Sequence, residues 1–406
     1  MAQVVAVEPA RVALVAGGGA VKAYAFHAGV LRAMQEDGFH FRSGVRWQPN
    51  AARPGVREVD TYVGSSAGAC VVAAMAAGRE VGELHQALTG SAADVPTFGY
   101  RVLFVPVAPN PVKYLRRLSR RWRLGDFQPH HLLDVGGLFT TAGVERYFRR
   151  HVLPTNRFAD LAARLYLVAT QVNSSRKVVF GPTDSLSDAG YDPSCAYYDN
   201  VAISRALAAA VSVPPVFAPY GIVNPASGKL FHYYDGEVRE PLSLDVARHS
   251  GARFVIASSI WRPYSYDESV GSLADWGMAA VGEQALHQMI GQKVEREREQ
   301  SSRFERLLDL VEAHGARHGV PSSAREALAG EICTLLAHRP MHTLFVAPEP
   351  SDVGFFFRGS FRFGRRLVDR CVEAGYRAYR RAVCDSPDFL PALDQALGAG
   401  EGEHGR

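Results

Sequence analysis

A Gly-x-Ser-x-Gly pentapeptide, Gly64-Ser65-Ser66-Ala67-Gly68, places a serine where a strand is expected to turn into a helix. The β-prone run 61–63 precedes it, and the small residues of 67–77 predict a helix after it. A serine in such a sharp turn is presented at the carboxyl end of its strand, and Gly64 and Gly68 permit the turn and the close strand–helix contact. Ser66 is therefore a candidate nucleophile. The alternative is a glycine-rich turn without catalytic function.

A second glycine-rich turn lies upstream, between the apolar run 12–16 and a predicted helix that extends to Asp37. Its residues are Gly17, Gly18, Gly19 and Ala20, and Lys22 follows shortly after. Unpaired amides at a helix amino terminus favour an anion. The patterns of nucleotide-binding loops, Gly-x-Gly-x-x-Gly and Gly-Lys-Ser/Thr, are not met. An oxyanion hole, in which each donor contributes on the order of 3 kcal/mol, fits better beside a serine turn, although a turn without any ligand stays open.

A serine hydroxyl requires a base, which is most often a histidine oriented by a carboxylate. Several histidines follow Asp235, but none of these lies in a glycine-flanked loop directly after a strand: His249, His287, His314, His318, His338 and His342. Asp235 itself ends a strand-like run and precedes Gly236, which places it at a sheet edge as Ser66 is placed. A carboxylate can act as the base if its pocket is partly dry and it touches the serine. A plain Asp-Gly turn is the alternative.

Strands and helices alternate through the first two thirds of the 406 residues. This order predicts an α/β fold with a mainly parallel central sheet and helices on both faces. We expect a leader over 1–10 and one domain over 11–385. Within that domain we expect a core at 12–260, a helical insertion at about 90–160 over the active face, and a helical C-terminal part at 269–385. A flexible tail is expected over 386–406.

Composition limits the function classes. A net charge of +4 does not indicate a nucleic-acid partner. Five scattered cysteines without a Cys-x-x-Cys pair fit a reducing compartment, and neither a signal peptide nor a transmembrane run is visible, so we expect a cytoplasmic protein. His314-x-x-x-His318 has the spacing of metal ligands but lacks a third ligand, so we expect no metal and no cofactor.

The segment 112–123 predicts a basic amphipathic helix. Leu115, Leu118 and Trp122 share one face, and the opposite face carries Lys113, Arg116, Arg117, Arg120 and Arg121. This pattern is typical of a helix that contacts a membrane surface. A solvated basic face on an ordinary packed helix is the alternative.

Together the glycine-rich turn, the serine turn and Asp235-Gly236 resemble the patatin-like phospholipase family, over residues 12 to about 259. The resemblance implies a patatin-like α/β/α sandwich with helical C-terminal additions. It implies a Ser66–Asp235 dyad and an oxyanion hole made by amides of Gly18, Gly19 and Ala20, with Gly17 as a further donor. Lys22 matches the family's basic residue, which would support the loop or meet a lipid head group. Glu237 stands where Gly or Ala is frequent, and we expect it to be tolerated.

The resemblance predicts a lipid acyl hydrolase that acts on phospholipids or other glycerolipids, with peripheral membrane contact and no nucleic acid. Three alternatives stay open. Two are other acyl-transfer enzymes, a transacylase or a Ser–His–Asp esterase. The third is a catalytically decayed scaffold that binds a membrane or a partner. We expect the insertion at 90–160 and the C-terminal helices to shape the substrate pocket.

Overall fold

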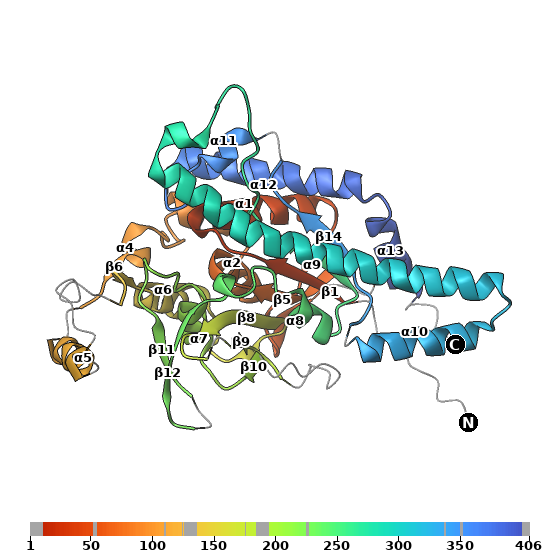
Figure 1. Ribbon diagram of the computed structural model, residues 1–406, viewed down its shortest axis with the longest axis horizontal. Coiled ribbons are helices and arrows are strands. Elements are labelled where there is room, and N and C mark those ends of the chain that lie inside the picture. Colours follow the sequence, from red (N-terminus) through yellow and green to blue (C-terminus); the bar gives the residue numbers. More distant parts are fainter. Residues whose placement is uncertain are drawn as a thin grey trace.

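The computed structural model describes residues 11–399, apart from 52–54, 109–110, 124, 126–135, 175, 184–194, 225–226, 337 and 350–351. The expected leader at 1–10 therefore lies outside the described residues. The described chain folds around one mixed sheet whose central strands are mostly parallel (Figure 1). This is the predicted α/β class.

Five strands form the centre of the sheet, in the order β8-β5-β1-β13-β14. They are β8 (Arg164–Gln171), β5 (Glu58–Gly64), β1 (Val12–Ala16), β13 (Phe254–Ser258) and β14 (His342–Val346), and each pairs in parallel with its neighbour. On the far side of β8, β9 (Lys177–Phe180) pairs antiparallel to it and is followed by β10 (Cys195–Tyr198). The carboxyl ends of β1, β5 and β13 therefore share one edge of the sheet.

Helices cover both faces because the central strands are apolar on both sides. Val12 and Leu14 of β1 belong to a core that includes α1 (Ala20–Glu36), α2 (Ser66–Ala76), α7 (Ile203–Ala210) and α12 (Arg365–Asp385). The alternate residues Ala13 and Val15 belong to a second core beneath α8 (Leu244–His249), and Val294 packs against this second core. The alternation along β1 therefore separates two apolar layers.

The C-terminal part is helical, as predicted. Helix α9 (Met278–Arg317) is 40 residues long and crosses the molecule, and α10 (Ser322–Leu335) folds back along its far end (Figure 1). A short 3-10 helix, η5 (Leu273–Trp276), precedes α9. None of the helices in the described part of the chain is long and apolar enough to cross a membrane.

One boundary differs from the sequence prediction. The expected flexible tail at 386–406 contains a helix, α13 (Phe389–Ala399), whose Phe389 and Leu393 are buried in the core. Apolar residues four apart give this helix a face that packs against the sheet. The part of the predicted tail over 400–406 lies outside the described residues.

Candidate active site

Ser66 stands at a strained turn between β5 and α2. Its φ of 51° is in the left-handed region, which non-glycine residues rarely adopt. The flanking glycines are required by close packing. A Cβ on Gly64 would lie 2.8 Å from the backbone nitrogen of Ala69, and a Cβ on Gly68 would lie 2.1 Å from the carbonyl oxygen of Ala16. The expected serine elbow is therefore present, and Ser66 is only 5% exposed.

Asp235 and Ser66 come together because their strands both pair with β8. Strand β5 pairs with the first half of β8 and ends with Gly64 opposite Leu167. Strand β12 (Leu230–Asp235) pairs antiparallel with the second half and ends with Asp235 opposite Ala169. Because β9 occupies the other edge of β8 at these positions, β5 and β12 run toward each other along one edge. Their ends, and hence Ser66 and Asp235, meet there.

The Asp235 side chain is completely buried. Its Oδ1 accepts the backbone N–H of Glu237 at 2.9 Å, whereas Oδ2 has no hydrogen-bond partner in the described structure. Burial raises the pKa of Asp235 to about 7, and the N–H of Glu237 and the Ser66 hydroxyl act in the opposite direction. A carboxyl that titrates near neutral pH suits a general base.

The Ser66 hydroxyl therefore lies close enough to influence the Asp235 carboxyl, but no aligned hydrogen bond joins them. Oδ2 of Asp235 stays without a hydrogen-bond partner among the described residues. Catalytic hydrogen bonds are often long or poorly aligned until the substrate binds. The free Oδ2 is thus the acceptor that a realigned Ser66 hydroxyl would use.

Hydrogen bonds of the Gly17 backbone hold the glycine-rich turn in place. The N–H of Gly17 donates to the carbonyl of Ser258 at 2.9 Å, so Gly17 is not available as an oxyanion donor, contrary to its inclusion from the sequence. Its carbonyl accepts the N–H of Gly68 at 3.1 Å and Nε2 of His27 at 2.8 Å. Since a peptide group is planar and trans, the N–H of Gly18 points away from Gly68, toward the Glu237 side chain.

His27 was not identified from the sequence as part of the site. Because a carbonyl only accepts, Nε2 carries the proton, and Nδ1 accepts the hydroxyl of Ser258 at 2.8 Å. Burial lowers the pKa of His27 to about 4, so the ring stays neutral. Its position five residues after Lys22, on the first helix, was the available signal.

The remaining donors of the turn differ from one another. The N–H of Gly18 donates to Oε1 of Glu237 at 2.8 Å. The amides of Gly19 and Ala20 make no hydrogen bond within the part of the chain that the structure describes. Gly19 and Ala20 have φ values of 128° and 56°, so the backbone is also unusual where α1 begins. These two amides are available to an anion beside Ser66.

Lys22 is buried and does not reach the Ser66 pocket. Its Nζ lies 3.2 Å from Oε1 of Glu283 on α9 and 3.4 Å from the carbonyl of Phe356. Desolvation lowers the pKa of Lys22, and the Glu283 carboxylate opposes that shift. Of its two expected roles, these contacts fit support of the loop, because they tie α1 to the C-terminal helices.

An apolar pocket opens beside Ser66. Its walls come from the elements expected to shape it, with Phe98, Leu103 and Val144 from the insertion and Phe361 from the C-terminal part. The remaining lining residues are Ala20, Val21, Tyr24, Ser66, Ala67, Cys70, Val211, Val213 and Phe217. The free space is only about 40 Å³, so an acyl chain would have to displace side chains at the mouth. Leu103 and Phe361 are half-buried there.

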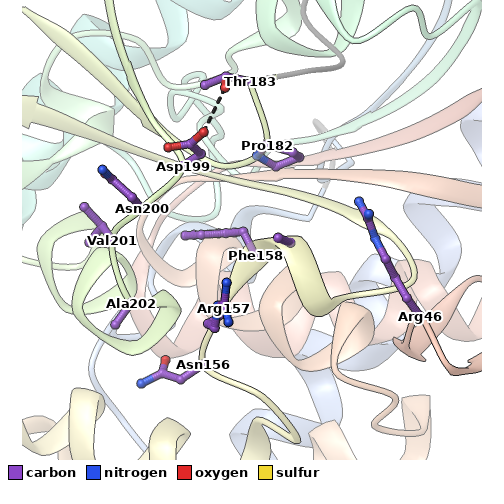
Figure 2. A pocket seen from close by; sticks show the side chains of 11 residues that line it. Arg46, Asn156, Arg157, Phe158, Pro182, Thr183, Asp199, Asn200, Val201 and Ala202 are labelled. Carbon is purple, nitrogen blue, oxygen red and sulfur yellow. Dashed lines mark hydrogen bonds between the residues drawn. The ribbon is translucent and has the colours of Figure 1, made fainter. Parts of the chain in front are cut away.

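A larger cavity of about 710 Å³ lies elsewhere (Figure 2). It is lined by Arg46, Phe158 and Asp199, and Asp199 accepts a hydrogen bond from Thr183 at 3.0 Å. Thr183 follows β9, which runs toward the start of β8, so this cavity is at the edge of the sheet opposite Ser66. Although this cavity is larger than the apolar pocket beside Ser66, its position excludes it as the place where Ser66 would react.

The predicted basic helix is present as α5 (Pro111–Arg123). Val112, Leu115 and Trp122 are exposed, Trp122 by 72%, and Arg116, Arg120 and Arg123 are exposed as well. The side chains of Lys113, Arg117 and Arg121 lie outside what the structure describes. Among the residues of α5 whose side chains the structure describes, both the apolar face and the basic face include exposed side chains.

A nucleophile-type turn, a buried acid and free backbone amides at the carboxyl edge of a mainly parallel sheet define an α/β protein of the hydrolase type. The sequence pattern of the patatin-like phospholipase family matches residues 14–248. Because this is more than half of the chain, the protein belongs to that family. No curated protein matches the chain.

Among solved structures, the crystal structure of VipD from Legionella pneumophila is similar over 93% of this chain and 67% of VipD, at 12% identity and a TM-score of 0.34. A likeness this distant carries no argument about the site. The family assignment thus rests on the sequence match alone, and it supports lipid hydrolysis in general terms.

Proposed function

We propose that this protein is a lipid acyl hydrolase that cleaves glycerolipid or phospholipid esters through a Ser66–Asp235 dyad. The observation that carries the proposal is the meeting of β5 and β12 along one edge of β8, which brings the serine turn to a buried carboxyl with an unpartnered oxygen. The family match supplies the lipid class of substrate.

The reaction proceeds in two steps. Asp235 takes the proton of the Ser66 hydroxyl while Oγ attacks the ester carbonyl, and amides of the glycine-rich turn stabilise the oxyanion. The intermediate collapses, the proton passes to the leaving alcohol, and an acyl-serine remains. Asp235 then takes a proton from the water that attacks the acyl-serine, and passes it to Oγ of Ser66 as the fatty acid leaves.

A dyad is favoured over a Ser–His–Asp triad. The groups that shift the pKa of Asp235 are its own burial, the backbone of Glu237 and Ser66, with no histidine among them. His287 packs against Trp261, its Nδ1 is engaged with the carbonyl of Arg262, and its Nε2 lies 3.9 Å from Glu283. Replacement of each histidine after Asp235 is expected to leave ester hydrolysis within about threefold of wild type. Loss at one of them would favour the triad.

The apolar pocket supports an acyl chain as the group that lies beside Ser66. Fatty-acid release from phosphatidylcholine micelles tests the function, with wild type, Ser66→Ala and Asp235→Asn as the set. We expect release by wild type and a loss of at least about a hundredfold in both variants. Equal release by wild type and Ser66→Ala would refute the proposal, and transfer of the acyl group to an added alcohol would indicate a transacylase.

We further propose that α5 contacts anionic membranes. Exposed Leu115 and Trp122 would enter the interface, and Arg116 and Arg120 would meet lipid phosphates. Sedimentation with phosphatidylserine vesicles compares wild type with Lys113/Arg116/Arg120→Glu and with a control, Arg296/Arg303/Arg306→Glu on α9. Reduced binding only in the α5 variant supports the contact, and equal binding by all three excludes it.

A further inference from the structure

Glu237 is enclosed within the site rather than directed to solvent. It is 6% exposed, and both carboxyl oxygens are engaged. Oε1 accepts the N–H of Gly18 at 2.8 Å and the hydroxyl of Ser65 at 2.5 Å, and Oε2 accepts Nε1–H of Trp261 at 2.6 Å. Three donors therefore hold one carboxyl group beside the catalytic serine.

The carboxyl group occupies the space that faces Ser66. A Cβ placed on Gly18 would lie 2.5 Å from Cβ of Ser66 and 2.7 Å from Cγ of Glu237. The two side chains therefore both lie against Gly18, on the side where its Cβ would be. An ester carbonyl attacked by Ser66 and bound by the Gly18 amide would need the place that the Glu237 carboxyl holds.

The amide of Gly18 is also the donor whose direction is most firmly fixed. The carbonyl of the same peptide group accepts from both Gly68 and His27, so the N–H cannot rotate away without breaking those bonds. One N–H directs one strong hydrogen bond. The Glu237 carboxyl and a substrate oxyanion therefore compete for it.

We propose that Glu237 is a plug: its carboxyl occupies the oxyanion hole of the free enzyme, and it must leave before the hole can accept a substrate. This inference rests on the proposed function, because a plug has meaning only if the Gly18 amide receives an oxyanion. The expectation that Glu237 is merely tolerated after Asp235-Gly236 is replaced by an active role.

Trp261 holds the Glu237 carboxyl in its position in the free enzyme. It is half-buried, and the segment that follows it, from 262 to 272, contains no helix or strand before η5 begins. Its indole N–H holds Oε2, the oxygen that Gly18 does not hold. A shift of the Trp261 ring would release one side of the carboxyl and weaken its hold on Gly18.

The test is the second-order rate constant for labelling of Ser66 by a small fluorophosphonate, whose phosphoryl oxygen requires the same donors. It uses the full chain of wild type, Glu237→Gly, Trp261→Phe and a matched control, Glu331→Gln, on the exposed face of α10. Since one oxyanion donor is worth on the order of a hundredfold in rate, we expect Glu237→Gly to react at least about tenfold faster than wild type.

Trp261→Phe keeps an aromatic ring and removes only the donor to Oε2, so it should react faster than wild type but more slowly than Glu237→Gly. The control should equal wild type. Thermal unfolding of each variant verifies that it is folded, and Trp261→Phe decides the matter if Glu237→Gly is unfolded.

Unchanged or slower labelling in the folded variants would overturn the plug and assign Glu237 a supporting role. That outcome leaves the proposed function intact, because wild type still reacts. Absence of labelling at Ser66 in every variant would instead refute the proposed function itself. The two failures are therefore distinguishable in one experiment.

Discussion

Ser66 and Asp235 stand at the facing ends of two strands that run toward each other along β8. The serine strand ends opposite Leu167 and the aspartate strand ends opposite Ala169, two positions further along. A parallel strand and an antiparallel strand thus place a nucleophile and a base from distant parts of the chain at one point.

The pH dependence of the reaction should report Asp235. Burial raises its pKa to about 7, so the carboxylate that can take the serine proton is lost as the pH falls below that value. We expect kcat/KM for a soluble p-nitrophenyl ester to rise with pH through about 7. A profile flat between pH 5 and 8 would show that another group acts as the base.

A second limb should report Glu237. Burial, with the nearby Asp235 carboxyl, raises its pKa to about 8, so above that pH it becomes a carboxylate that binds the Gly18 amide more strongly and competes better with an oxyanion. We expect kcat/KM to fall above about pH 8 in wild type and to stay level in Glu237→Gln. Persistence of the falling limb in this variant would contradict the assignment, and Glu331→Gln is the control.

Stability should decline over a related pH window. In the unfolded chain, Asp235 and Glu237 have their ordinary pKa values of 3.8 and 4.5. In the native state these pKa values are raised to about 7 and about 8, so at intermediate pH the native state keeps protons that the unfolded chain has released. Native stability therefore falls as pH rises from about 4 to 8. Asp235→Asn should be more stable than wild type at pH 8, on the order of 2 kcal/mol or more, and the difference should shrink near pH 4.

Thermal and urea unfolding at both pH values measure this difference. A variant that is less stable than wild type at pH 8 would show that the Asp235 carboxylate is better satisfied than its unpartnered Oδ2 suggests.

His27 should act as a positioning residue. His27→Phe removes the donor to the Gly17 carbonyl, so the Gly18 amide is less firmly directed. We expect kcat to fall by about tenfold with little change in KM, because the oxyanion donor matters most in the transition state. His27→Gln, whose side-chain amide can donate to the same carbonyl, should restore part of the loss.

The pH profile separates this role from general-base catalysis. Since burial lowers the pKa of His27 to about 4, the rise of kcat/KM through about pH 7 should persist in both His27 variants. A limb that disappears with the imidazole would make His27 a proton carrier instead.

The sequence predicted those parts of the site that rest on local backbone geometry. The serine turn requires glycines at 64 and 68 because their Cβ atoms would overlap the neighbouring backbone, and such a requirement is visible in the motif itself. The strand ends at Ala16 and Asp235 are also visible locally, because each strand-like run stops directly before a glycine. The predicted sheet and its helical layers follow from apolar runs of the right length.

The parts that the sequence did not reveal depend on pairing between distant segments. Glu237 is adjacent to the predicted acid, yet its target, the Gly18 amide, is 219 positions away. Gly17 was predicted as an oxyanion donor, but its N–H donates to the carbonyl of Ser258 on the neighbouring strand. Helix α13 lies in the segment expected as a tail, and it is ordered because Phe389 and Leu393 are buried in the core formed by distant segments.

The most direct test of the central claim is mass spectrometry of the protein after reaction with a fluorophosphonate, with wild type, Ser66→Ala, Ser65→Ala and Asp235→Asn in parallel. The account predicts one phosphonyl adduct on the peptide that contains Ser66, its absence in Ser66→Ala, its presence in Ser65→Ala, and at least about a hundredfold slower formation in Asp235→Asn. An adduct that persists in Ser66→Ala, or that forms equally fast in Asp235→Asn, would contradict the Ser66–Asp235 dyad.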